Sequence, residues 1–511
     1  MATAVRKSGI DGPQTRAVTA GLILMAGSVA TGGLALILSS DFTDNFPYLF
    51  LLPWIIALAA VFAAPTLYLY YRGRLTLYDP LVFATWSYFF PAFVVGGFML
   101  TGGWSQPFFL NLIQDSNYNL PYTVVLIMLG YGGLAAGYFS HIGSRGGAAL
   151  GRYLPTRDFD APAMLLPGLF LLLLGTFNTA AALILGVIGY QRSEVIESFT
   201  GIVFLTTLFW MQGSFILWYI IFRRGVFDVQ SGVLCGLLLT VTIGRALFSG
   251  NRAALFQVFI IVMLAFLLAG RKLNFVRTAT AGVVLCACLI LGMIYGTTFR
   301  NVKGSESQVS IDQYTENIFE TFDQVGRFDL GNSLEFALMG IAERLDTLSS
   351  VAVVVSNYEQ LAPYEESYGL DGNIWKDLST FFIPRIFWSE KPVASEPRKY
   401  SDLYFSYGET SFAITPIGDL LRNYGPIGVP IGMFLFGIVI RLIYRSLIEG
   451  QPRSVWRATL YFMLIMAISY EGFYGLLIPF LVKVGITAIV GIVIVGIVAR
   501  SMGHIRKAQP L

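Results

Sequence analysis

Long apolar stretches alternate with short polar ones along most of the chain. A helix that crosses the hydrocarbon core of a bilayer needs about 20 mostly apolar residues, and twelve segments of this sequence meet that length. The pattern therefore predicts an all-α, multi-pass membrane protein with about twelve transmembrane helices. The predicted spans are residues 17–38, 48–71, 80–100, 121–140, 163–187, 201–222, 230–248, 253–270, 279–298, 424–445, 455–474 and 478–499.

One polar interruption is much longer than the others and divides the chain into three parts. Residues 299–412 carry nine Lys or Arg and eighteen Asp or Glu, and they separate nine helices in residues 1–298 from three in residues 413–511. A loop of this length is usually functional. Apolar residues recur every three or four positions over 330–351, which predicts an amphipathic helix. Gly, Pro and aromatic residues dominate 364–411, which predicts irregular, turn-rich structure.

The composition supports a membrane protein, and the positions of the charges predict its orientation. Hydrophobic residues make up 55% of the chain and charged residues only 13%, against about 25% charged in a typical soluble domain. Seven clusters in alternate loops and at both termini hold 20 of the 34 Lys and Arg. Because cytoplasmic loops are enriched in Lys and Arg, we expect both termini in the cytoplasm and residues 299–412 outside.

Several kinds of chemistry are disfavoured. The sequence has no phosphate-binding loop or dinucleotide fingerprint, and the predicted cytoplasmic loops are short. It has no zinc-ligand spacing and no basic block typical of nucleic-acid binding, so we expect no metal, cofactor or nucleic acid. Both histidines fall on the predicted cytoplasmic side, and a general base on the outer face would be a carboxylate or a tyrosine. The carboxylates that we expect are Glu343, Asp346 and Asp419.

Fourteen Lys and Arg lie outside the cytoplasmic clusters, against the orientation rule. A long side chain near a helix end can reach the headgroups, which is one explanation for each of them. The other is a shared cationic site, because the guanidinium fork matches phosphate oxygens. Arg245 is the best candidate, since an Arg inside a membrane helix costs about 2.5–3.5 kcal/mol on translocon scales. The other cations considered are Arg192, Arg252, Arg300, Arg327, Arg344, Arg385, Lys391, Arg422 and Lys483.

Two short segments concentrate the remaining candidate chemistry. Residues 382–392 set Arg385, Trp388 and Lys391 between two prolines, which would hold them rigidly at the outer interface. An ordinary interfacial loop anchored by tryptophan is the alternative. Residues 418–428 include Asp419, Arg422 and Tyr424. The Asp and the Arg share a helical face, so they either pair with each other or bind a ligand.

Both segments resemble motifs of one family. Residues 384–392 carry Pro-Arg, Trp and Lys-Pro in the order of the PR..W..KP signature of Wzy-type O-antigen and exopolysaccharide repeat-unit polymerases. Residues 419–428 resemble the family's glycine-containing segment that leads into a late helix. Arg245 and Arg252 resemble the arginines that flank a short outer loop in mid-chain. The layout of about twelve helices with one large outer loop is also similar.

This resemblance implies a fold, a reaction and a location. It implies a GT-C-like, metal-independent glycosyltransferase of the bacterial cytoplasmic membrane, with a chain-length regulator and a flippase as partners. The growing glycan would move from undecaprenyl diphosphate to the non-reducing end of a lipid-linked repeat unit. O-antigen ligases share the layout, but they rely on a histidine in the large loop, and residues 299–412 contain none. A flippase of lipid-linked oligosaccharide is a further alternative.

The predicted site follows from the charges and the motifs together. The residues expected to be catalytic are Arg245, Arg252, Arg385, Glu343, Asp346 and Asp419. The residues expected to bind substrate are Arg192, Arg300, Arg344, Trp388, Lys391, Arg422 and Tyr424. The arginines would hold the lipid diphosphate and stabilise the charge of the leaving group.

Overall fold

The architecture is that of an all-α, multi-pass membrane protein. The computed structural model describes residues 46–105, 107–156, 158–159, 161–184, 200–225, 228–250, 253–304, 311–327, 345–383, 387–388, 390–392, 395–408, 411–501 and 505–506. Within these ranges nine helices are long and apolar enough to cross a membrane, and two more apolar helices are shorter. In chain order the spans and the two shorter helices are α2 (Leu52–Tyr71), the run of α3 (Pro80–Ala84), η2 (Thr85–Val95) and α4 (Gly96–Thr101), α6 (Ser116–Phe139), α8 (Leu165–Ile184), α9 (Thr200–Thr207) with α10 (Phe209–Arg224), α11 (Val229–Ser249), α12 (Ala254–Leu268), α13 (Phe275–Lys303), α19 (Thr415–Leu447), α20 (Val455–Met466) and α21 (Tyr474–Ser501).

Eleven of the twelve predicted spans contain one of these helices, and the first, 17–38, lies outside the described residues. The predicted span 455–474 is too long, because α20 ends at Met466 and residues 467–473 are not helical. The predicted start of the span 424–445 coincides with a break at Gly425 in α19, and residues 415–424 before the break are helical as well. The early turns of α19 carry an Asp and an Arg, and these lower the hydropathy on which the prediction depended.

The long segment between α13 and α19 contains more helix than the sequence predicts. Its described helices are α14 (Ile311–Arg327), α16 (Thr347–Tyr368), α17 (Asn373–Thr380) and α18 (Pro397–Phe405). The prediction of irregular structure over 364–411 is therefore wrong for α17, α18 and the end of α16. The amphipathic helix predicted over 330–351 falls mostly outside the described residues. Where it is described, residues 347–355 of α16 are buried on all sides.

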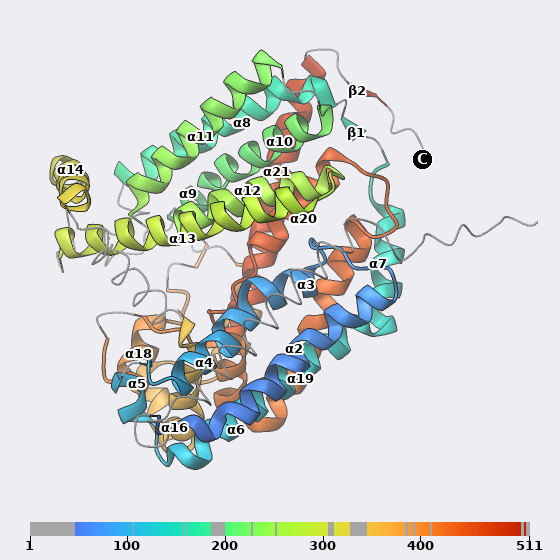
Figure 1. The fold of residues 1–511 in the computed structure, drawn as a ribbon. Helices are drawn as coiled ribbons and strands as arrows, with labels where there is room; N and C mark the ends of the chain where they lie inside the picture. The colour runs from blue at the N-terminus through green and yellow to red at the C-terminus, as the bar shows by residue number, and fades with distance from the viewer. Residues whose placement is uncertain are drawn as a thin grey trace, which may run out of the picture.

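The helices form two groups joined by α20 and α21 (Figure 1). In one group α6 packs along α19 and also contacts α2, while α3 contacts α19. In the other group α10 packs against α8, α11 and α12, and α12 packs against α13. Helix α21 contacts α8 and α10 in the second group and α19 in the first.

Close packing of α6 on α19 depends on glycines four residues apart. A Cβ atom added at Gly133 would lie 2.4 Å from the carbonyl oxygen of Pro430, and one added at Gly137 would lie 2.0 Å from that of Phe434. In lipid the hydrophobic effect does not drive helices together, so their association depends on van der Waals packing. Stripes of small residues allow that packing because they let the two backbones approach closely. The α6–α19 pair thus forms the most extensive helix–helix contact of its group.

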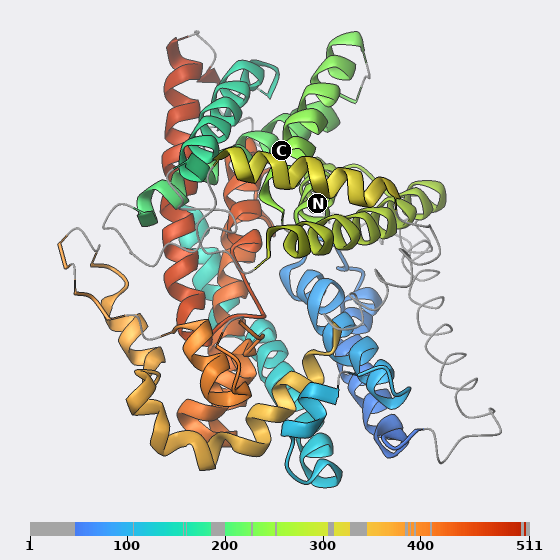
Figure 2. The same cartoon turned by 90° about the vertical axis from the view of Figure 1, so that its left-hand side faces the viewer.

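The two ends of the helix bundle differ in their connections. At one end α7 (His141–Tyr153) packs along α19, and β1 (Asp158–Phe159) pairs antiparallel with β2 (Ile505–Arg506). At the other end α16 contacts α18 and α5 (Pro107–Leu112), while α17 contacts α21 (Figure 2). The charge rule predicts that the end with α7 and the strands is cytoplasmic and that the end with α16, α17 and α18 is outside.

Candidate functional site

The first turns of α19 contain a buried ion pair. Asp419 and Arg422 lie three residues apart on one helical face, and both side chains have no exposed surface. The Nη2 atom of Arg422 lies 3.0 Å from Oδ1 of Asp419, and its Nε donates to the same oxygen at 3.1 Å. The sequence left open whether Asp419 and Arg422 pair with each other or bind a ligand, and in the structure they pair with each other.

The other donors of Arg422 also have acceptors. Nη1 lies 3.0 Å from Oε1 of Glu365, at the end of α16, and 3.3 Å from the carbonyl oxygen of Leu370. Nη2 donates to Oδ1 of Asn373, on α17, at 2.6 Å. A guanidinium has five N–H donors, and these contacts together with the Asp419 pair provide five acceptor contacts. Arg422 therefore ties three helices together and has no donor left for a substrate.

Asp419 is equally engaged. Asn373 donates to its two oxygens at 3.1 and 3.3 Å, and Asn423 donates to Oδ1 at 3.3 Å. The backbone N–H of Gly475, at the start of α21, donates to Oδ2 at 3.2 Å. We call Glu365, Asn373, Asp419 and Arg422 the Arg422 cluster. It joins α16, α17, α19 and the start of α21. Helix α21 begins directly after residues 467–473, the non-helical stretch that follows α20.

Asn373 also connects this cluster to the second predicted motif. Its amide donates to Oγ of Ser395 at 2.8 Å, and the Ser395 hydroxyl donates to Oδ2 of Asp377. Burial raises the pKa of the Asp377 carboxyl, and the nearby Asp419 raises it further, while Lys483 and Lys391 lower it. The Lys391 ammonium also donates to the carbonyl oxygen of Ile383 at 3.1 Å. The structure thus brings Lys391 of the 382–392 segment close to Asp377 on α17.

Tyr424 lies at a break in α19. Gly425 has φ +67° and ψ −171° in the middle of the helix, and Pro426 follows it. This backbone region is essentially restricted to glycine. The kink leaves the Tyr424 side chain 45% exposed beside the Arg422 cluster.

Arg245 lies in the other helix group, near the end of α11. Its guanidinium carbon is 4.0 Å from the ring centroid of Trp210 on α10, which is a close cation–π contact. Its Nε atom is buried and has no hydrogen-bond partner, and none of the described carboxylates forms an ion pair with Arg245. A cation so enclosed is costly in a membrane unless it has a partner.

A cavity of about 420 Å³ lies beside Arg245, between α8, α11 and α14. Arg245 is the one charged side chain among the described residues that line it. Tyr314 of α14 contributes its ring, and its hydroxyl donates to the carbonyl oxygen of Phe248 on α11. The residues around the cavity are Thr176, Thr179, Ala180, Leu183, Ile184, Thr240, Val241, Gly244, Arg245, Phe248, Tyr314 and Thr315. We call this space the Arg245 cavity.

The cavity can therefore accept an anion at one wall and apolar groups elsewhere. The hydroxyls of Thr176, Thr179 and Thr240 already donate to carbonyl oxygens of their own helices, at 2.8, 2.8 and 2.9 Å. The open donors of the Arg245 guanidinium are thus its main means of holding a phosphate.

The remaining predicted residues are dispersed. Asp346 is 2% exposed and caps α16, where it accepts from the backbone N–H of Ser349 at 3.2 Å and from the Ser105 hydroxyl. Arg300 lies on α13 directly after Phe299. The ring of Phe299 packs against that of Tyr314, with centroids 5.4 Å apart. Trp388 is 38% exposed. The predicted residues that lie outside the described part of the chain are Arg192, Arg252, Glu343, Arg344 and Arg385.

Sequence reasoning missed the partners of both arginines. Glu365 and Asn373 belong to the stretch read as irregular, and no spacing connected them to Arg422. Trp210 lies inside an apolar run, where it resembled any other core residue. Tyr314 follows a short polar stretch in the outer segment. The sequence signals for Arg245 were its place in an apolar helix, against the orientation rule, and the resemblance to family arginines, and neither signal pointed to Trp210 or Tyr314.

The comparisons with known proteins gave one match. A family model described as "Domain of unknown function (DUF8712)" matches residues 176–448, which is more than half of the chain. The matched stretch contains Arg245, α14 and three of the four helices that meet at the Arg422 cluster, α16, α17 and α19. Neither the curated proteins nor the solved structures gave a match. The chain belongs to the family of this domain of unknown function.

Proposed function

We propose that the protein is a glycosyltransferase that works at the outer face of the bacterial cytoplasmic membrane. It would transfer a growing glycan from undecaprenyl diphosphate to the non-reducing end of a lipid-linked repeat unit. The proposal rests on the resemblance of residues 384–392 and 419–428 to repeat-unit polymerases and, above all, on the environment of Arg245. That residue is a largely enclosed cation without an ion-pair partner, and it borders a cavity large enough for a ligand.

A lipid diphosphate suits this environment. Arg245 lies four residues before the end of α11, in the half of the helix that the charge rule predicts to be outside. A diphosphate at the membrane interface would reach that depth, while its sugars would lie beyond it. The guanidinium would stabilise the negative charge that develops on the departing diphosphate, which is electrostatic catalysis. The energy for transfer is in the donor's glycosyl-phosphate bond, and no nucleotide is required.

The Arg422 cluster has a different role in this proposal. Arg422 and Asp419 have their donors and acceptors occupied by the protein, so we assign them to holding α16, α17, α19 and α21 together. Asp346 is engaged as a helix cap. Glu343 is then the predicted carboxylate that would deprotonate the acceptor hydroxyl.

The direct test is polymer formation by purified protein in proteoliposomes that contain undecaprenyl-diphosphate-linked repeat units. Wild-type protein should produce a ladder of glycans. Arg245→Ala should slow its formation by about a hundredfold, in the range found when one transition-state donor is removed, and Arg245→Lys should recover part of the rate. Thermal stability should change little, because the substitution removes no ion pair.

The matched control is Arg72→Ala. Arg72 also lies over an aromatic ring, at 5.4 Å from the centroid of Tyr68, but at the predicted cytoplasmic end of α2. The Arg72→Ala substitution should leave the rate of polymer formation unchanged. Wild-type activity in Arg245→Ala would remove Arg245 from the site. Movement of the lipid-linked unit across the bilayer without any polymer would show a flippase instead.

A further inference from the structure

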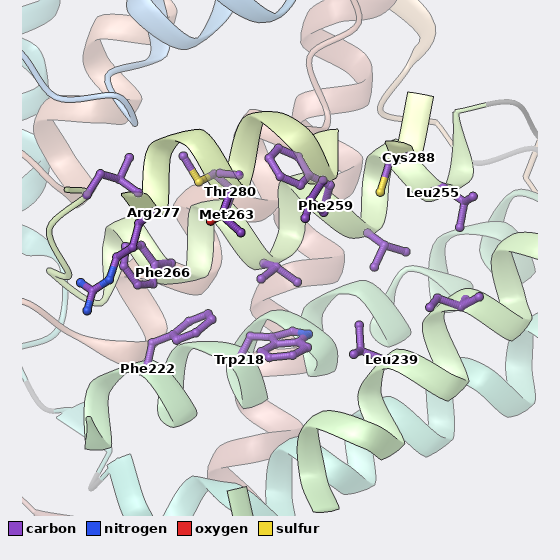
Figure 3. A pocket seen from close by; sticks show the side chains of 16 residues that line it. Trp218, Phe222, Leu239, Leu255, Phe259, Met263, Phe266, Arg277, Thr280 and Cys288 are labelled. Atoms are coloured by element: carbon purple, nitrogen blue, oxygen red, sulfur yellow. The ribbon is translucent and has the colours of Figure 1, made fainter. Parts of the chain in front are cut away.

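A second cavity lies on the opposite side of α11, and it is almost wholly apolar (Figure 3). It has a volume of about 550 Å³ and lies between α10, α11, α12 and α13. Its polar lining is limited to Arg277, Thr280 and Cys288. The other lining residues are Trp218, Phe222, Leu239, Ile243, Leu255, Val258, Phe259, Val262, Met263, Phe266, Leu273, Ala281 and Val284.

The cavity has the length of one acyl chain in one leaflet. Along α12 its lining runs from Leu255 to Phe266, and along α13 from Arg277 to Cys288. Eleven helical residues rise about 16 Å, and half of the hydrocarbon core measures about 15 Å. In Figure 3 Arg277 and Phe266 mark one end, and Cys288 and Leu255 mark the other. The cavity is therefore about as long as one acyl chain, and Arg277 lies at one of its ends.

Guanidinium groups gather at the surface end. Arg277 is held over the ring of Phe266, 5.9 Å from its centroid, and its Nη1 donates to the carbonyl oxygen of Lys272 at 3.0 Å. Arg271 donates from Nε to the carbonyl oxygen of Phe222 at 2.6 Å and from Nη2 to that of Arg223 at 3.3 Å. These contacts fix the guanidinium of Arg277, which lines the cavity, and that of Arg271, which binds the backbone of the lining residue Phe222, and they leave each with unused donors.

Among the described residues, no carboxylate pairs with the arginines at this end of the cavity. None of the described ion pairs involves Arg271 or Arg277. Asp228, at the start of α11, caps that helix by accepting from the backbone N–H of Ser231 at 2.8 Å. The opening thus combines a positive rim with an apolar interior about 16 Å long.

We propose that this cavity binds an anionic glycerophospholipid from the cytoplasmic leaflet. One acyl chain occupies the apolar interior, and the phosphate group contacts Arg277 and Arg271. The positive rim complements the charge of the headgroup, and juxtamembrane cations favour anionic lipids in this way. The interior matches an acyl chain in length and in polarity.

The site is separate from the Arg245 cavity. Leu239 and Ile243 of α11 face the apolar cavity, whereas Thr240, Gly244 and Arg245 face the other. A bound phospholipid would therefore brace α11 from the side opposite to Arg245. The inference does not depend on the proposed function.

Native mass spectrometry of the full-length protein in detergent tests the proposal. The probes are phosphatidylglycerol, phosphatidylcholine with the same acyl chains, and undecaprenyl phosphate, each added at matched concentrations. Wild-type protein should retain phosphatidylglycerol in preference to phosphatidylcholine. Arg277→Gln should reduce that preference about fivefold, as expected for the loss of one interfacial charge.

A pair of substitutions on α13 separates the interior from the rim. Ala281→Phe fills the cavity and should reduce retention of phosphatidylglycerol while leaving every charge in place. Val283→Phe is the matched control, because Val283 is 70% exposed and does not line the cavity. It should retain the lipid as wild type does.

Three results would overturn the proposal. The first is equal retention of phosphatidylglycerol and phosphatidylcholine by wild-type protein. This result does not depend on whether any variant folds. The second is undiminished retention by both Arg277→Gln and Ala281→Phe. The third is preferential retention of undecaprenyl phosphate, which would assign the cavity to the polyprenyl chain of a substrate.

Discussion

Replacing Arg422 by methionine should destabilise the protein strongly. The substitution keeps an apolar stem of similar length and removes a guanidinium whose side chain has no exposed surface. It leaves the buried carboxylates of Asp419 and Glu365 without the cation that lies 3.0 Å from each. Breaking a buried ion pair by removing one partner typically costs about 3–5 kcal/mol. We expect a loss in that range because two carboxylates lose their partner together.

The free energy of unfolding can be measured by titrating sodium dodecyl sulfate into protein in mixed micelles and following tryptophan fluorescence. Lys376→Met is the matched control, because Lys376 pairs with Asp371 at 2.8 Å but with side chains 40% and 47% exposed. An exposed pair contributes about 0–1 kcal/mol. The control should therefore differ from wild type by no more than that amount.

A triple variant distinguishes lost charge balance from lost packing. Adding Asp419→Asn and Glu365→Gln to Arg422→Met removes the uncompensated carboxylates, and the triple variant should be more stable than the single one. The reasoning would be refuted if Arg422→Met destabilised the protein no more than Lys376→Met does. It would also fail if the triple variant were the least stable of the set.

Three further predictions concern packing, pH and backbone geometry. Gly137→Ala should lower the free energy of unfolding by about 1–3 kcal/mol through overpacking, because its Cβ would lie 2.0 Å from a carbonyl oxygen of α19. Gly132→Ala has nothing within 4 Å and should not destabilise; equal losses in both would contradict the close-packing argument. Since burial raises the pKa of Asp377 in the folded state, wild-type stability should fall as pH rises above the unfolded value of about 4. Asp377→Asn should show less of this fall in unfolding titrations at several pH values, and an identical pH profile would count against it. Gly425→Ala should cost about 1–3 kcal/mol because φ is +67° there, and an unchanged unfolding midpoint would argue against strain at the kink.

Much of the fold follows from hydropathy because a bilayer imposes a length and a polarity on each span. Every predicted span within the described residues contains an apolar helix, from α2 to α21. The ends were predicted less well. Helix α20 stops at Met466, and α19 begins before its apolar core. In both places tertiary contacts satisfy backbone or charged groups that a single segment cannot satisfy alone.

The candidate site divides in the same way. By its sequence position Arg245 was already a cation in the wrong place, since the orientation rule gave it no role, and the structure added Trp210 and the cavity beside it. Arg422 was equally misplaced by sequence, and the structure gives it Glu365 and Asn373 as partners.

The sequence by itself therefore determined that the chain is a multi-helix membrane protein, and it identified the cations that need an explanation. Apolar length and the cost of charge in lipid are local properties, and they can be read one segment at a time. Only the tertiary structure decided which cation is neutralised and which is not. That outcome depends on groups more than 50 residues apart in the chain, such as Glu365 and Arg422, coming within 3.0 Å of one another.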